Sequence, residues 1–167
     1  MKRIGATFFL AAVLAAGTTA TAGFYDATIL ADNPVGYWRL GEAPGSATVA
    51  DLTGNGHTGN VIGSGTTLGV PGAILGDPDT AVDFPGSWGN KIDVPWSAQL
   101  NPTSFTVELW AKLEGGGGYR SPLTSRADHP QRGYILYANP SNNWDFWNGT
   151  GGGWHGIGGG PVTYNEW

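Results

Sequence analysis

The clearest hydrophobic pattern in the chain is the segment SFTVELWAKL at residues 104–113. Every second residue from Phe105 to Leu113 is apolar, and of the residues between them only Trp110 is apolar. A period of two places alternate side chains on opposite faces of a β-strand. The pattern therefore predicts a strand with one face in the core, ended by the four glycines at 115–118.

Shorter apolar runs bounded by turn residues predict further strands on both sides of this segment. These predicted strands cover residues 36–40, 80–84, 91–95, 121–126, 133–139 and 143–149. A short helix is expected before Pro34, over residues 24–31, and a mobile glycine-rich loop over 149–160. Many short strands separated by turns are typical of an antiparallel sandwich or barrel, so the predicted fold class is all-β.

The first 22 residues have the pattern of a signal peptide. Two basic residues precede an apolar stretch over 4–16, and ATA at 20–22 has the small-residue form of a cleavage site. This apolar stretch is shorter than the roughly 20 residues that cross a bilayer. We therefore expect residues 1–22 to be removed and a single domain over 23–167 to be secreted, to the periplasm, the cell surface or the medium, without membrane insertion.

The composition of the remaining domain excludes several kinds of chemistry and partner. There is no cysteine, so disulfides, thiol nucleophiles and zinc–thiolate sites are excluded. Without the signal peptide, six basic residues face 13 acidic ones, a net charge of about −7. Affinity for nucleic acids and for anionic membranes depends on basic residues, so we expect neither as a partner.

Several motifs in a fixed order resemble a laminin-G-like domain of the concanavalin A-like lectin/glucanase superfamily. They are PVGYWRLGE at 34–42, ADLTGNGHTGN at 50–60, VDFPG at 82–86, KIDVP at 91–95 and LNPTSFTVELWAKL at 100–113. The resemblance covers nearly all of residues 37–167 and implies an antiparallel jelly-roll β-sandwich that binds a ligand. In such domains a segment like YNEW at 164–167 leads into more strands, so we expect a copy that lacks its last strands and belongs to a longer reading frame.

The first of these motifs is expected to be structural. Tyr37, Trp38 and Leu40 are predicted to form an early strand with alternate side chains buried, because large aromatic residues are more often core than binding surface. Arg39 and Glu42 are expected to form a nearby ion pair, which adds little stability if it is exposed.

No catalytic residue is predicted. Glucanases of the superfamily place Glu-x-Asp-x-Glu on one strand, so that all three carboxylates share a face. Here Glu108 has only Thr106 and Trp110 at the equivalent positions. The three histidines are far apart and lack the i, i+4 spacing of a helical zinc pair. A glycoside hydrolase remains the alternative to a binding protein.

Calcium is the one cofactor that the sequence suggests, because it takes six to eight oxygen ligands from flexible loops. Asp51 and Asn55 in DLTGNG offer such oxygens, although an Asp/Asn-Gly turn in which the aspartate binds its own backbone is the favoured interpretation. Asp128 follows the central strand, and in the pentraxins, which this region resembles, an acid near that place helps to hold calcium.

Four aromatic residues are the predicted ligand-binding residues: Tyr137, Trp144, Trp147 and Trp154. Indole rings stack on the apolar faces of sugars, and a site of this kind is a concave face with a few polar groups. Trp144 and Trp147 are three residues apart, so on one strand they face opposite sides and one is expected in the core. Trp154, in the expected glycine-rich loop, is the better candidate for contact.

Together these patterns lead to a ranked set of functions. The first is a secreted module that binds a carbohydrate or an extracellular protein, with or without calcium. The alternatives are a glycoside hydrolase of the same superfamily and a purely structural domain of a larger cell-envelope protein.

Overall fold

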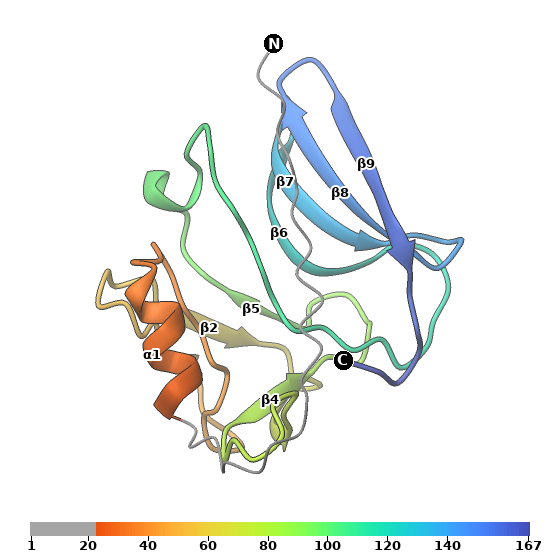
Figure 1. Cartoon of the computed structure of the whole chain (residues 1–167). Helices are drawn as coiled ribbons and strands as arrows, with labels where there is room; N and C mark the ends of the chain where they lie inside the picture. Colours follow the sequence, from red (N-terminus) through yellow and green to blue (C-terminus); the bar gives the residue numbers. More distant parts are fainter. Residues whose placement is uncertain (1–22) are drawn as a thin grey trace.

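The computed structural model describes residues 23–167, and the predicted signal peptide at 1–22 lies outside them. Almost all regular structure is β (Figure 1). The elements are α1 (Gly23–Ala31), β1 (Thr48–Val49), β2 (Gly59–Ile62), β3 (Thr67–Pro71), β4 (Thr80–Asp83), β5 (Lys91–Asp93), the 3-10 helix η1 (Ala98–Leu100), β6 (Arg120–Asp128), β7 (Gln131–Ala138), β8 (Asn143–Thr150) and β9 (Trp154–Pro161). The all-β sandwich predicted from the sequence is confirmed.

The strands form three antiparallel sheets. They have the orders β1-β2-β5, β3-β4 and β6-β7-β8-β9. The last is a meander of hairpins, and Asn142 adopts a φ of 57° in the β7–β8 turn, a conformation that asparagine tolerates better than most residues. The four-stranded sheet stands opposite the smaller sheets, with the chain between β5 and β6 passing between them (Figure 1).

Strand register gives the four-stranded sheet two distinct faces. Leu136 pairs with Phe146 and Ala138 with Trp144, so these side chains share what we call the inner face. Phe105, from the chain between β5 and β6, packs there, with ring centroids 4.7 Å from Tyr134 and 6.3 Å from Phe146. The opposite, outer face is defined by the alternate residues Tyr137, Asp145 and Trp147.

The segment predicted as the central strand, 104–113, has no strand partner along most of its length. Residues 105–112 have no regular secondary structure, and among the described residues the chain here forms only one bridge, a parallel one between Leu113 and Tyr164. The alternation correctly places Phe105 toward the sheet. Alternation indicates that one face of a segment is buried, but it does not specify which strand lies beside that segment. The expected pairing with a neighbouring strand is not found among the described residues.

Two other expectations were wrong. Residues 36–40 are not a strand, and Leu40 has a φ of 63° that breaks an extended run. The glycine-rich stretch expected to be a loop is instead β9, which pairs with β8 from Asn143 to Gly149. Glycine is a poor strand former, but pairing with the backbone of β8, interrupted by one irregularity between Asn143 and Asp145, overrides this weak preference.

Candidate functional site

Three aromatic rings meet on the outer face of the four-stranded sheet. Tyr137 on β7 and Trp147 on β8 lie 5.8 Å apart with their planes at 89°. Tyr119, directly before β6, lies 5.0 Å from Tyr137 and 6.1 Å from Trp147. Tyr119 is 57% exposed, and the other two rings are half-buried. These three residues, which we call the outer aromatic cluster, present ring surface to solvent from three adjacent segments.

The glycines of β9 leave room for this cluster. Gly156 pairs with Trp147, and a Cβ atom at Gly156 would lie 3.0 Å from the indole Nε1, which is tighter than almost any real contact. Gly158 pairs with Asp145 on the same face. The indole of Trp147 can therefore lie against β9, whose paired residues on this face carry no side chains.

Polar groups surround the rings. Arg126 Nη1 donates a hydrogen bond of 2.7 Å to the hydroxyl of Tyr137, and Arg126 Nε lies 3.6 Å from the Asp128 carboxylate. Asn139 Nδ2 donates to Asp145 Oδ2 at 3.0 Å. The partly exposed rings are thus flanked by a few fixed donors and acceptors.

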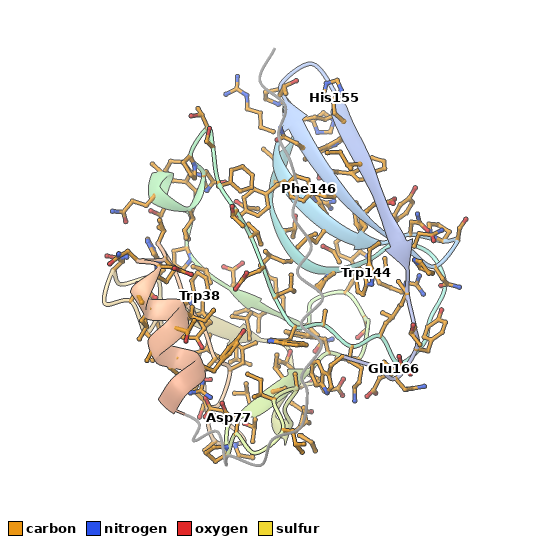
Figure 2. The ribbon with its side chains drawn as sticks, viewed as in Figure 1. Trp38, Asp77, Trp144, Phe146, His155 and Glu166 are labelled. Carbon is orange, nitrogen blue, oxygen red and sulfur yellow. The ribbon has the colours of Figure 1, made fainter. Side chains whose placement is uncertain are left out.

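The structure brings three of the four predicted aromatic residues to this face. Tyr137 and Trp147 belong to the cluster, and Trp154 pairs with Gly149, which places it on the same outer face. Trp144 and Trp147 face opposite sides, as expected from their spacing, and Trp144 is the one on the inner face, where it lines an apolar hollow of about 300 Å³. Figure 2 shows Trp144 and Phe146 along β8.

Sequence reasoning missed Tyr119 and Arg126 as members of the site. Tyr119 follows four glycines and has no periodic pattern of its own. Arg126 was part of a predicted strand, but its contact with Tyr137 depends on the β6–β7 register, in which it stands opposite Gly133. Only the pairing of strands places these two side chains beside the predicted ones.

The residues predicted as metal ligands are not brought together. Asp51 belongs to the loop before β2, whereas Asp128 ends β6 on a different sheet and lies near Arg126. Asn55 Nδ2 donates 2.9 Å to the carbonyl of Val35. Within residues 23–167, no group of three or more histidine, cysteine or acidic side chains is placed to hold a metal ion.

Asp51 instead holds backbone groups. Its Oδ1 accepts from the Tyr37 N–H at 3.1 Å, the Thr53 N–H at 3.0 Å and the Thr53 hydroxyl at 2.7 Å, while Oδ2 accepts from the His57 N–H at 3.0 Å. Burial raises the pKa of Asp51, but these hydrogen bonds outweigh it and the net pKa is lowered. The bonds to Thr53 agree with the favoured interpretation of a turn in which the aspartate binds the neighbouring backbone. The bonds from Tyr37 and His57 add contacts with more distant residues.

The PVGYWRLGE motif is structural, as expected, but through different contacts. Trp38 Nε1 donates 2.7 Å to the carbonyl of His57. Arg39, whose side chain is only 14% exposed, does not pair with Glu42; it binds three aspartates from two other segments, Asp26, Asp77 and Asp79. Glu42 Oε1 accepts from the Ala50 N–H at 2.7 Å.

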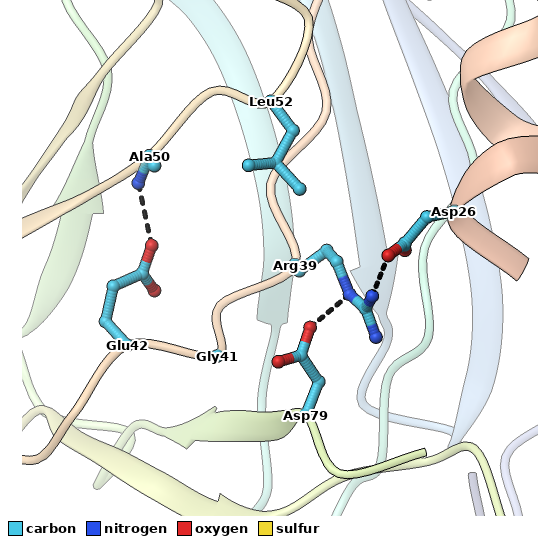
Figure 3. Close-up of a pocket in the computed structure, with 7 residues that line it drawn as sticks. All are labelled: Asp26, Arg39, Gly41, Glu42, Ala50, Leu52 and Asp79. Carbon is cyan, nitrogen blue, oxygen red and sulfur yellow. Dashed lines mark hydrogen bonds and ion pairs between the residues drawn. The ribbon is translucent and has the colours of Figure 1, made fainter. Parts of the chain in front are cut away.

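These carboxylates raise the pKa of Arg39 against the lowering effect of its burial. The pKa of Tyr37 is also raised, first by burial and then by the 2.9 Å hydrogen bond that its hydroxyl donates to Asp26. Figure 3 shows Arg39 between Asp26 and Asp79 at the edge of a hollow of about 320 Å³. The arginine thus connects α1, the first loop and the loop before β4, and we assign this hollow a structural role.

Comparison with known proteins supports the fold alone. No protein-family model and no curated protein matches the chain. A solved S-layer domain-containing protein (residues 221–444) from Clostridium thermocellum is similar, with a TM-score of 0.58 and 20% sequence identity. The match covers 79% of this chain and 60% of that one, so the chain spans less than two thirds of its structural neighbour. The described residues contain no helix with the length and hydrophobicity of a membrane span.

Proposed function

We propose that this chain is a cell-surface or secreted binding module whose outer aromatic cluster binds carbohydrate. The observation that carries the proposal is the contact of Tyr119, Tyr137 and Trp147 on one solvent-facing side of the four-stranded sheet. The resemblance to laminin-G-like and concanavalin A-like domains supports a binding role. The fold shared with an S-layer domain-containing protein supports a place at the cell envelope.

The surroundings of the cluster favour a neutral glycan. Pyranose rings present apolar C–H faces that stack on aromatic rings, while their hydroxyls need donors and acceptors such as Asp145 and Asn139. The domain carries a net charge of about −7, which repels sulfated and uronic-acid-rich polymers. A neutral polysaccharide therefore matches both the rings and the charge.

The proposal is tested by affinity electrophoresis in gels that contain laminarin, xylan, soluble cellulose derivatives or agarose. Y119A and W147A should each weaken binding about tenfold, the effect of losing about 1.4 kcal/mol. W88A is the matched control, because Trp88 is 99% exposed in the β4–β5 loop and lies outside the cluster. Equal retardation of all three variants, or no binding of the folded chain to any of these polymers, would contradict the proposal.

The same gels address calcium and catalysis. Asp128 ends β6 on the outer face beside Arg126, so calcium bound there would change binding between gels with calcium and gels with chelator. Release of reducing sugar from these polymers would instead favour the glycoside hydrolase.

A second candidate is a structural domain of a larger cell-envelope protein. The similarity to an S-layer domain-containing protein, 60% of which the match covers, favours this candidate. It predicts that the outer aromatic cluster packs against another domain and that the free chain binds no polysaccharide.

A further inference from the structure

Trp154 lies on the outer face of the four-stranded sheet, on the strand next to that of Trp147. It pairs with Gly149 of β8, two positions from the pair formed by Trp147 and Gly156. Both tryptophans are half-buried, and neither indole N–H has a hydrogen-bond partner among the described residues. Neither N–H is one of the buried groups left without a partner, so both reach solvent. The two indoles therefore offer ring surface and a hydrogen-bond donor on the same face.

No side chain of β9 separates Trp154 from the outer aromatic cluster. The next two residues of β9 on this face are Gly156 and Gly158. A Cβ atom at Gly156 would lie 3.0 Å from Trp147 Nε1, and one at Gly158 would lie 3.9 Å from Asp145 Oδ1. The indole and the carboxylate of β8 thus lie beside a strip of β9 that carries backbone alone.

Tyr137, Trp147 and Trp154 follow a diagonal across three adjacent strands (Figure 1). Tyr137 on β7 pairs with Asp145, two positions before Trp147, and Trp154 on β9 pairs with Gly149, two positions after it. Each step crosses one strand and moves two residues in the same direction. Diagonal neighbours of this kind lie about 7–8 Å apart, so these three residues, which we call the diagonal row, span about 15 Å.

We propose, on the basis of the carbohydrate-binding function above, that the ligand is a linear glycan of several linked sugars lying along the diagonal row. A single pyranose ring is too short to contact both ends of the row. Linked sugars in an extended chain present one ring face after another, together with hydroxyls that the indole N–H groups and Asp145 can bind. Trp154 then contacts sugars beyond those held by the outer aromatic cluster.

The test is isothermal titration calorimetry with laminari-, xylo-, cello- and agaro-oligosaccharides, from the disaccharide to the hexasaccharide. Affinity should increase with chain length. W154A should weaken binding of the hexasaccharide about tenfold, the loss of one stacking contact, and binding of the disaccharide less than about twofold. W147A should weaken binding at every length, because Trp147 belongs to the outer aromatic cluster.

H155A is the matched control. His155 is the next residue of β9, is exposed, and pairs with Asn148 on the inner face, so its removal changes the same strand without altering the diagonal row. Circular dichroism shows whether each variant is folded. If W154A does not fold, nuclear magnetic resonance of the wild type still tests the contact. The hexasaccharide should shift the indole N–H signal of Trp154, which W154F assigns.

Two outcomes would overturn the diagonal row and leave the carbohydrate site in place. One is a W154A variant that binds the hexasaccharide as tightly as the wild type while W147A binds it weakly. The other is an affinity that does not depend on chain length, with no shift of the Trp154 signal. Failure of the folded wild type to bind any of these sugars or their polymers would overturn the carbohydrate proposal and the diagonal row together.

Discussion

At the scale of single residues, Asp51 determines how the first two motifs of the domain fit together. Its carboxylate accepts hydrogen bonds from Tyr37, Thr53 and His57, which are separated by as many as 20 residues along the chain. In the same loop, the carbonyl of His57 accepts a hydrogen bond from the indole N–H of Trp38. Because every bond to Asp51 is donated to the ionised carboxylate, its contribution to stability depends on its charge.

We predict that D51N lowers the free energy of unfolding by about 1–3 kcal/mol at neutral pH, since the amide lacks one acceptor and its NH₂ faces backbone donors. The folded-state pKa of Asp51 is lowered, so the wild-type advantage is complete above the unfolded pKa of about 3.9 and is lost as pH falls through the folded pKa. Urea denaturation of both proteins at neutral and acidic pH measures this.

D128N is the matched control, because Asp128 is exposed and has only a 3.6 Å contact with Arg126. A stability difference between the wild type and D51N that stays constant from neutral to acidic pH would contradict the assigned role of Asp51.

At the scale of elements, the β6–β7 hairpin depends on one glycine within β7. Gly133 has a φ of 91°, and a Cβ atom there would lie 2.0 Å from the carbonyl oxygen of Ser125 on β6. It also pairs with Gly149 of β8, so three strands approach closely at this point. No other residue type fits both the conformation and the space.

We predict that G133A lowers the free energy of unfolding by at least about 2 kcal/mol, because the left-handed conformation and the contact with Ser125 both penalise a side chain. The control is G152A in the β8–β9 turn, where an added Cβ meets nothing within 4 Å. G152A should change stability by less than about 1 kcal/mol. Thermal unfolding followed by circular dichroism compares them, and equal melting temperatures would refute the packing argument.

At the scale of the whole molecule, Phe105 joins the inner face of the four-stranded sheet to the chain between β5 and β6. Phe105 contacts Tyr134 and Phe146, and burial raises the pKa of Tyr134 in this contact region. Beyond Phe105, Leu109, Trp110 and Ala111 line the apolar hollow beside Trp144. Phe105 therefore contributes to the association of the two layers, beside the hydrogen bonds of Ser125 with Asn101 and of Tyr134 with Leu100.

We predict that F105A lowers the free energy of unfolding by about 2 kcal/mol, less than for a fully buried phenylalanine because the ring is partly exposed. T106A, on the exposed side of the same strand, should change stability by less than about 0.5 kcal/mol. Urea denaturation measures both, and hydrogen exchange of β7 amides should rise in F105A alone. Faster exchange in both variants, or in neither, would contradict the coupling of the layers through Phe105.

The elements that could be predicted from the sequence are those that depend on neighbouring residues along the chain. The all-β class, the helix before Pro34 and strands β4 to β8 follow from local alternation and turn residues. The same period of two correctly separated Trp144 from Trp147, because successive side chains of a strand point to opposite faces whatever the strand pairs with. Alternation alone did not say which of the two tryptophans lies on the outer face beside Tyr137.

Contacts between residues far apart in the sequence could be seen only in the tertiary structure. Arg39 meets Asp77, 38 positions along the chain, and Tyr119 meets Trp147 through strand register, so neither contact has a local signal. The glycine run became β9 because β8 lay beside it, whereas residues 105–112, with a far stronger strand pattern, have no strand partner within residues 23–167. Alternation specifies which face a strand buries, but hydrogen bonds between strands require a neighbour that only the fold can supply.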